Sequence, residues 1–287
     1  MKKLCRKLLR LMPDRTYIQL QYFYHFHHFA NLKNPQTFNE KLQWLKLYDR
    51  KPLYTMLVDK YAVKKWVADK IGEQYIIPTL GVWKKGKDID FDKLPNQFVL
   101  KVNHDSGGIV ICRDKSKLDK QAAVAKLSRA LKNNGYWYGR EWPYKNVKPC
   151  IIAEKYMEDA QHQLNDYKFF CFNGKPKFIL FGSNRFGKGG LKVTFYDTNW
   201  QKLPFARVYH TVDIPTKKPT QLSLMLTLAE RLSAGLPFAR IDFYQVGEQI
   251  YFGEITLYPA SGVEGFEPPE WDSLIGSWLA LPKEELV

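Results

Sequence analysis

The stretch Ala239–Gly262, ARIDFYQVGEQIYFGEITLYPASG, decides the fold because it predicts two strands joined by a tight turn. Both halves carry the β-branched and aromatic side chains that suit a half-buried pleated surface. Gly247 interrupts them where a turn is needed. Antiparallel pairing then places Asp242 and Glu254 side by side on one face. Because like charges directly opposite each other are destabilising, this pair needs a cation.

A hard divalent ion such as Mg²⁺ fits two adjacent carboxylates, since it prefers oxygen ligands and keeps other positions for water and phosphate. Arg240 lies two residues before Asp242 and therefore points to the same face. Its planar guanidinium suits a phosphate or a developing oxyanion. From these residues alone, a hairpin with two solvated acids and a surface ion pair stays equally open.

Charge and composition limit the kinds of partner that this protein can have. The chain has 287 residues and a formal net charge of +15, from 44 Lys and Arg against 29 Asp and Glu. Such an excess indicates an anionic partner: nucleotide phosphate, nucleic acid, acidic polysaccharide or a membrane surface. The four cysteines form no CxxC pair and predict reduced thiols in a cytosolic protein: Cys5, Cys112, Cys150 and Cys171.

The N-terminus is basic, but charges interrupt its apolar residues, so we expect neither a signal peptide nor a membrane-spanning helix. Leu4, Leu8 and Leu11 recur at helical spacing among Lys and Arg. That pattern fits a helix lying on anionic lipid or an ordinary packed helix. The cluster His25, His27 and His28 lies among aromatic residues, which favours a packed helix over a metal site.

Helix signals recur along the chain. Thr37 opens one helix with a T-x-x-E capping box. Pro52 starts another, which we expect to run to about Ile71. A solvated face is the default interpretation of its Lys64 and Lys65, and contact with a phosphate stays open. Two more helices are expected over residues 116–134 and 220–234.

A glycine-containing hairpin follows the first predicted strand, Phe98–Val102. Residues 103–108 read NHDSGG and lead into a return strand, Ile109–Cys112. A tip of bare backbone amides forms an anion-binding concavity, and Lys101 adds a positive charge beside it. The loop is neither a Walker A sequence nor a Rossmann GxGxxG, and an ordinary glycine turn stays open as an interpretation.

Further strands are predicted near Glu154 and near the pair Asp166 and Lys168. Residues 151–154, IIAE, form a strand that ends in Glu154. Asn173-Gly174 is the strongest hairpin signal in the chain. Asp166 and Lys168 flank one residue at the start of that hairpin and therefore share a face. The basic glycine-rich loop that follows, residues 184–190, is open to two interpretations, a cover over a substrate or a mobile loop.

The ordered set of motifs resembles the ATP-grasp superfamily, and more closely its TupA-like branch, which is associated with bacterial surface polysaccharide and teichuronopeptide biosynthesis. The segments NPQTFNEKLQWLK, LKVNHDSGG, DYKFFCFNGKPK and GEITLYPASG carry the closer match, and the resemblance covers residues 34–280. It implies an α+β fold in which two subdomains clasp ATP. We expect an N-terminal helical region at 1–74, a lid subdomain at 75–150 and a C-terminal subdomain at 151–287.

The resemblance also implies ATP and Mg²⁺ as cofactors and assigns residues to them. The phosphates and the flap over them correspond to Lys101, His104, Ser106, Gly107 and Gly108. The hinge beside adenine corresponds to Glu154, Lys155, Tyr156 and Met157. One further nucleotide contact corresponds to Lys168. The Mg²⁺ ligands correspond to Asp242, Glu254 and Thr256.

Thr256 stands where the usual pattern has Asn, which leaves the number of Mg²⁺ ions open. Arg240 is expected to meet the transferred phosphoryl group and, with Lys101 and Arg185, to be catalytic. Lys188 and Tyr258 are expected near the acceptor.

The implied reaction is the ligation of a carboxylate to an amine through an acyl phosphate. The carboxylate would belong to a uronic acid in a sugar polymer or precursor, and the amine to an amino acid or peptide. We expect a cytoplasmic bacterial protein, with the inner face of the membrane as an open location. A kinase acting on a hydroxyl, a glycosyltransferase and a non-enzymatic binder of an anionic polymer stay open. Nucleic acid is not expected, since no recognition motif is present.

Overall fold

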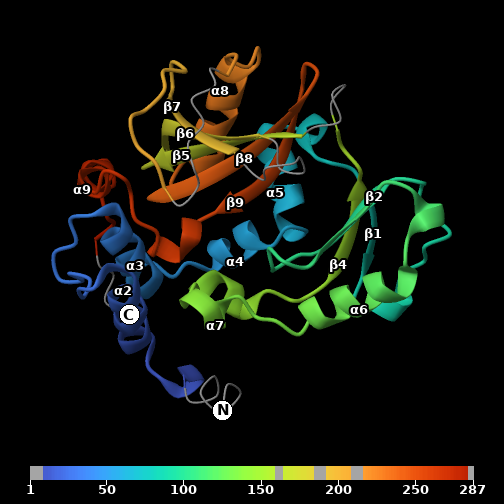
Figure 1. The fold of residues 1–287 in the computed structure, drawn as a ribbon, viewed down its shortest axis with the longest axis horizontal. Helices are drawn as coiled ribbons and strands as arrows, with labels where there is room; N and C mark the ends of the chain where they lie inside the picture. The colour runs from blue at the N-terminus through green and yellow to red at the C-terminus, as the bar shows by residue number, and fades with distance from the viewer. Residues whose placement is uncertain (1–8, 159–163, 184–191, 208–215, 284–287) are drawn as a thin grey trace.

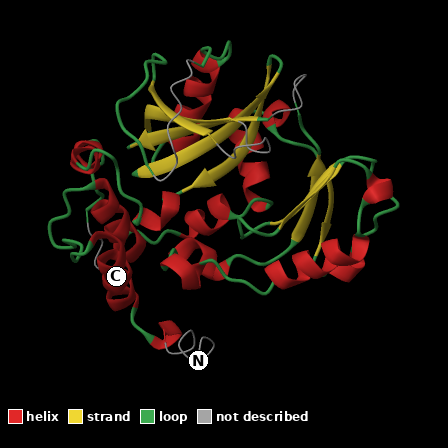
Figure 2. Cartoon of the chain, viewed as in Figure 1, coloured by secondary structure: helices red, strands yellow, loops and turns green. Residues whose placement is uncertain are grey.

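The computed structural model describes residues 9–158, 164–183, 192–207 and 216–283. It contains two antiparallel sheets with helices packed around and between them (Figures 1 and 2). The predictions made for Leu4, Cys5, Leu8, Arg185 and Lys188 lie outside the described residues. No described helix is long and apolar enough to cross a membrane.

The smaller sheet has four strands in the order β1-β4-β2-β3. Its strands are β1 (Thr79–Trp83), β2 (Phe98–Val102), β3 (Ile109–Cys112) and β4 (Ile151–Lys155). Strand β2 buries Phe98, Leu100 and Val102 on one face, where helix α6 (Lys120–Ala130) packs. Since side chains alternate along a strand, Val99 and Lys101 face the opposite side, which is turned toward the second sheet.

The larger sheet has five strands in the order β7-β6-β5-β8-β9. They are β5 (Asn165–Phe172), β6 (Lys175–Ser183), β7 (Lys192–Asp197), β8 (Phe238–Val246) and β9 (Gln249–Thr256). Helix α8 (Leu222–Ser233) covers one face (Figure 1). On the other face, Phe172 and Phe238 pack with Phe38 of helix α3. Farther along β8 the same face carries Arg240 and Asp242, so it is apolar at one end and charged at the other.

Each sheet has its own hydrophobic core. One cluster of buried residues joins the five-stranded sheet to helices α3, α4, α5, α8 and α9. A second cluster lies between the four-stranded sheet and α6. Among the described residues, these two clusters are separate.

All three predicted hairpins are confirmed, since β2 pairs with β3, β5 with β6 and β8 with β9. Asn173 and Gly174 adopt positive φ angles of 47° and 80° in the β5–β6 turn, as a two-residue hairpin turn of this type requires. Gly247, at φ 59°, makes the β8–β9 turn. Asp242 pairs directly with Glu254 in the register of β8 and β9.

The helix predictions are confirmed at Thr37 and wrong in part elsewhere. Thr37 and Glu40 form the expected capping box at the start of α3 (Phe38–Tyr48). The single helix expected from Pro52 is two, α4 (Pro52–Val58) and α5 (Ala62–Ile71). The break arises because the Asp59 carboxylate accepts hydrogen bonds from the Tyr61 and Ala62 amides at 2.9 and 3.1 Å, which starts a new helix.

Two further helix starts lie later than predicted. Helix α6 begins at Lys120 because Asp119 accepts from the Ala122 amide at 2.8 Å. Helix α8 begins at Leu222, since the Thr220 hydroxyl lies 3.2 Å from Glu248 and does not cap the helix. The other α-helices are α2 (Asp14–Phe26), α7 (Tyr136–Gly139) and α9 (Glu270–Ser277). Short 3₁₀ turns are η1 (Glu73–Tyr75), η2 (Gly86–Asp88), η3 (Lys115–Lys117), η4 (Trp142–Asn146) and η5 (Pro259–Gly262).

Candidate active site

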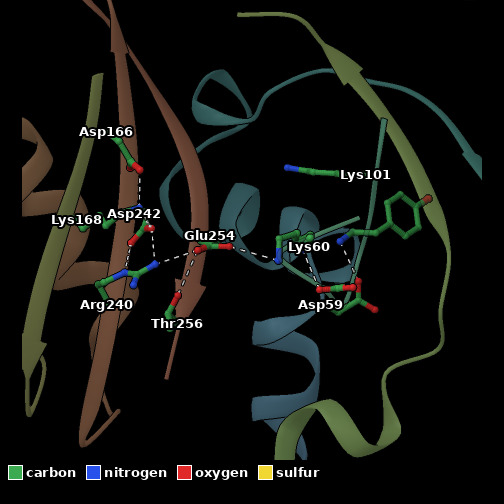
Figure 3. A network of polar contacts seen from close by, with 12 residues as sticks. Asp59, Lys60, Lys101, Asp166, Lys168, Arg240, Asp242, Glu254 and Thr256 are labelled. Carbon is green, nitrogen blue, oxygen red and sulfur yellow. Dashed lines mark hydrogen bonds and ion pairs between the residues drawn. The ribbon is translucent and has the colours of Figure 1, made fainter. Parts of the chain in front are cut away.

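A charged cluster occupies the polar end of the five-stranded sheet (Figure 3). Arg240 binds both oxygens of Asp242, at 2.7 Å from Nε and 2.7 Å from Nη2. The same Nη2 lies 2.9 Å from Oε1 of Glu254. One guanidinium thus compensates the two opposed acids that the sequence predicts, and its fork geometry suits this bidentate contact.

Lys168 completes the buried side of the cluster. Its Nζ lies 2.5 Å from Asp242 and 2.6 Å from Asp166, which confirms that Asp166 and Lys168 share a face. Burial acts to lower the pKa of Lys168, but the two carboxylates outweigh burial and raise it. Lys168 is therefore held as a cation behind Asp242, on the side away from the cluster's exposed rim.

Glu254 lies at the exposed rim. Its side chain is 33% exposed, against 1% for Asp242. Lys60 approaches Oε2 at 3.4 Å from the break between α4 and α5. Burial would raise the pKa of Glu254, but Lys60 and Arg240 lower it well below its usual range. Thr256 Oγ1 lies 3.5 Å from Oε1 of Glu254, so the three predicted Mg²⁺ ligands share one face.

A second charged cluster forms on the four-stranded sheet around Glu154. Lys64 and Lys101 bind its two oxygens at 2.6 and 2.7 Å. Burial alone would raise the pKa of Glu154, yet the two lysines lower it. The prediction that Lys64 is solvated is wrong, because its side chain is only 13% exposed. Lys65, by contrast, is exposed and pairs with Asp69 on the helix surface.

Between the two sheets lies a cavity of about 190 Å³. One side is apolar, because Val99 and the facing β3 residues Ile109 and Ile111 all point into it. Six of the predicted nucleotide contacts line it: Lys101, Ser106, Glu154, Lys155, Tyr156 and Met157. Tyr244 of β8 closes it from the other sheet. An apolar slot with lysines at one end suits a flat base carrying phosphates.

The predicted glycine flap, residues 103–108, is not simply a tip of free backbone amides. The Gly107 amide donates to the Asp105 carboxylate at 2.9 Å. A side chain at Gly108 would meet Ala130 and Val102 at 2.6 Å, so this glycine allows close packing against α6. His104 is buried, with Nδ1 3.0 Å from the Asn103 side chain and Nε2 2.9 Å from the Asn133 carbonyl. These hydrogen bonds fix the conformation of the loop.

A larger cavity of about 520 Å³ opens on the other side of this loop. It contains Arg240, Glu254 and Thr256 at one end, together with Lys60. Its remaining lining residues are His104, Asp105, Ser106, Asn133, Gly135, Tyr138, Glu141, Tyr144, Tyr258, Ala260 and Ser261. Ser106 belongs to both cavities, so the loop separates them, and Arg240, Glu254 and Lys60 of the charged cluster line the larger one.

The predicted magnesium ligands fit that ion in number and kind. Within the described residues, no three His, Cys, Asp or Glu side chains form a complete protein-only metal site. Asp242 and Glu254 instead offer two directly paired carboxylates, of which Glu254 lines the open cavity with Thr256 while Asp242 is buried beside it. Mg²⁺ commonly takes one or two carboxylates and completes its shell with phosphate oxygens and water, so the donor set suits an ion that arrives with a nucleotide.

Several lining residues escaped prediction. Lys60 and Lys64 read as surface lysines, yet both bind site carboxylates. The available signal was Asp59, whose side chain favours a helix start and marks the break that turns Lys60 inward. Tyr244 and Glu141 line the cavities without any motif of their own.

Two antiparallel sheets that enclose a lysine-lined slot, with paired acids and an arginine on a neighbouring hairpin, define the ATP-grasp class. The sequence matches the TupA-like ATP-grasp family over residues 40–280. The chain therefore belongs to the TupA-like ATP-grasp family, an ATP-binding branch of the ATP-grasp ligases. This confirms the α+β fold and the family that the motifs indicated.

The solved structures similar to this chain include other ATP-grasp enzymes. D-alanine–D-alanine ligase from Bacillus anthracis, complexed with ATP, is 18% identical over 79% of this chain and 68% of its own, with a TM-score of 0.40. The Helicobacter pylori D-alanine–D-alanine ligase is 16% identical over 85% and 69%, with a TM-score of 0.43. N5-carboxyaminoimidazole ribonucleotide synthetase from Thermus thermophilus is 14% identical over 76% and 51%, with a TM-score of 0.41. No curated protein matches the sequence.

Proposed function

We propose that this protein is an ATP- and Mg²⁺-dependent carboxylate–amine ligase that acts through an acyl phosphate. The observation that carries the proposal is the junction of the two cavities. Ser106 lies on both, and Arg240, Glu254 and Lys60 line the larger one next to it. A nucleotide in the slot between the sheets would direct its phosphates toward this junction, where a carboxylate acceptor can meet them.

The slot divides naturally between base and phosphates. Adenine would lie between Val99 and Tyr244, against the hinge at Glu154–Met157. Lys101 and Lys64, now bound to Glu154, would take the first phosphates. Mg²⁺ on Asp242, Glu254 and Thr256 would supply charge neutralisation at the terminal phosphate. Lys168 would then position Asp242 rather than touch the nucleotide, since its Nζ is held by Asp242 and Asp166.

The chemistry needs what these residues provide. A carboxylate is a poor acyl donor because oxide would have to leave. Phosphoryl transfer from ATP gives an acyl phosphate with phosphate as the leaving group. Arg240 and Lys60 line the cavity at the junction. Their positive charges would stabilise the negative charge that spreads over the oxygens of the transferred phosphoryl group. An amine then attacks the acyl carbon, and no Ser or Cys nucleophile is required.

For the acceptors, the family resemblance favours a uronic acid carboxylate and the amine of an amino acid or peptide, in bacterial surface polysaccharide synthesis. The net charge of +15 suits an anionic glycan. We place the reaction in the cytoplasm, at the inner face of the membrane. The N-terminal segment offers exposed apolar side chains for that contact, with Leu11 82% and Tyr24 77% exposed.

Trapping with hydroxylamine tests the reaction class. Purified protein is incubated with ATP, Mg²⁺, hydroxylamine and either D-glucuronate or D-galacturonate. We expect the sugar hydroxamate and inorganic phosphate in equal amounts, and neither product with the Glu254→Gln variant. The exposed-lysine variant Lys65→Met is the control and should behave as the native chain. A stable sugar phosphate without hydroxamate would assign a kinase instead, and no ATP consumption with either sugar would contradict this choice of acceptor.

A further inference from the structure

The larger cavity, which contains Arg240, also contains a carboxylate that the proposed phosphoryl transfer does not use. Glu141 lines this cavity and is half-buried. It follows the last residues of α7 and lies beside the loop that comes after β9. Behind it is Lys46 of α3, which is fully buried and donates to the Gly139 carbonyl at 2.8 Å and to Ser261 Oγ at 3.1 Å. A buried charge of this kind demands a partner.

The loop beside Glu141 is held in a strained shape. Ala260 and Ser261 both adopt left-handed backbone angles, with φ of 48° and 55°. Such residues are strained and persist only where the surroundings fix them. Gln43 of α3 fixes them here, donating to the carbonyls of Ser261 and Gly262 at 3.1 and 2.6 Å. Helix α3 therefore fixes the conformation of Ala260 and Ser261, which form the floor of the cavity.

Close approach at this floor also depends on Gly139. A side chain there would meet Ser261 Oγ at 1.9 Å and Glu141 Oε1 at 3.1 Å. Gly139, Glu141 and Ser261 are thus packed as one unit. The packing presents the carboxylate to the cavity while its neighbours fix its orientation.

The other acids of the cavity are occupied. Glu254 is bound by Arg240 and Lys60. Asp105 accepts from the Gly107 amide and from Asn133 at 2.9 and 3.1 Å. Burial would raise the pKa of Asp105, but these hydrogen bonds outweigh it and lower the pKa, which makes Asp105 a weak base.

Glu141 has the opposite character. Burial raises the pKa of its carboxyl, and Lys46 and Ser261 offset only part of the rise. Tyr144 also lines the cavity, together with the cations Arg240 and Lys60. The cavity thus contains both cations for phosphate and a separate basic carboxylate.

We propose that Glu141 binds the ammonium group of the amine substrate and accepts its proton before amide formation. This inference rests on the proposed ligase function. The ammonium N–H gives its proton to the Glu141 carboxylate, and the freed lone pair attacks the acyl phosphate carbon. A C–N bond forms, the C–O bond to phosphate breaks, and the second amine proton leaves with the released phosphate.

Comparing a cationic with a neutral nucleophile tests this role. The assay uses D-glucuronate, ATP and Mg²⁺ with either L-alanine, an ammonium at pH 7, or hydroxylamine, which is uncharged there. General-base removal typically costs 10²–10⁴-fold. For Glu141→Gln we expect amide formation with L-alanine to fall by about 100-fold or more. Hydroxamate formation should stay within about threefold of the native chain, because it needs neither ammonium binding nor this base.

Two further variants serve as controls for this test. Glu230→Gln changes a surface glutamate that pairs with Lys175 outside the cavities and should leave both products unchanged. The double variant Glu141→Gln with Lys46→Met removes both buried charges together, so it keeps the charge balance if the single variant folds poorly. It should show the same selective loss of the L-alanine product, and the loss should shrink as rising pH converts the ammonium group of L-alanine to the free amine.

The outcomes separate the two proposals. Unchanged amide formation by Glu141→Gln, or an equal loss with both nucleophiles in a folded variant, would overturn the role of Glu141 and leave the ligase standing. Native protein that yields neither product would overturn the ligase assignment with this acceptor, and the role of Glu141 with it.

Discussion

Asp242 and Glu254 face each other directly across β8 and β9, and both bind the guanidinium of Arg240. The wider cluster is balanced in charge, with three acids and three cations: Asp166, Asp242, Glu254, Lys60, Lys168 and Arg240. Nucleotide phosphates would compete for Lys60 and Arg240, and the acids they release would become available to the accompanying Mg²⁺. The protein's own cations thus keep the two acids in place until the ligand arrives.

The two acids should respond differently to substitution. Asp242→Asn removes the buried carboxylate that Arg240 and Lys168 share and should lower the free energy of unfolding by about 3 kcal/mol or more. Glu254→Gln acts at the exposed rim and should cost about 1 kcal/mol or less. Both should lose the rise in melting temperature that Mg²⁺ with a non-hydrolysable ATP analogue gives the native chain. A full rise in Glu254→Gln would contradict its place in the site.

Lys64 and Lys65 are adjacent in sequence and form a matched pair for substitution. Lys64→Met removes one of two lysines from the buried Glu154, which should cost about 1–3 kcal/mol and weaken nucleotide binding. Lys65→Met loses only an exposed pair with Asp69 and should change stability by less than about 0.5 kcal/mol. Urea unfolding and nucleotide titration measure both effects. Equal behaviour of the two variants would show that the Glu154 cluster needs only Lys101.

Gly107 and Gly108 also form a pair. The Gly108→Ala methyl would meet Ala130 and Val102 at 2.6 Å, so α6 has to shift, at a cost of about 1–3 kcal/mol. The Gly107→Ala methyl has open space, with Asp105 at 3.8 Å as its nearest neighbour, and should change stability little. Thermal unfolding distinguishes the two. If Gly107→Ala were the more destabilising variant, the close contact behind Gly108 would not be limiting.

Lys46 should give the stability curve a recognisable pH dependence. Burial lowers the pKa of Lys46 to about 8, below its ordinary value of 10.5. Between these values the unfolded chain binds more protons than the folded chain, so the free energy of unfolding rises with pH. Relative to Lys46→Met, the native chain should gain roughly 3 kcal/mol across this range. Denaturant unfolding of both proteins from pH 7 to 10.5 measures the difference, and parallel curves would mean that folding does not lower the pKa of Lys46, so that Lys46 stays a cation when buried.

Much of this site could be predicted because its residues lie on strands. The alternation of side chains along β8 and β9 sets the faces of Arg240, Asp242 and Glu254, and the Asn173-Gly174 turn fixes the register of β5 and β6. Those geometries follow from local sequence. The division of the chain into subdomains at residues 74 and 150 stays a prediction, although β4 pairs with β1 and β2.

What escaped prediction depends on how helices and loops pack. Lys60 and Glu141 reach the cavities only because a helix breaks at Asp59 and a strained loop is held by α3. Neither position shows a period or a motif. The apparent anion-binding tip of the glycine loop has a packing role at Gly108 instead, and only the position of α6 reveals it. Tertiary contacts of this kind cannot be read from one segment at a time.

The slot between the sheets has a consequence for cooperativity. Its walls come from two sheets whose cores share no buried residues in the described chain, with Val99 of β2 on one side and Tyr244 of β8 on the other. Separate cores allow each sheet to open as its own unit. A base inserted between the sheets would contact both and add apolar burial to each. A bound nucleotide would therefore couple the two folding units, and its residence time would also set how often the two sheets separate.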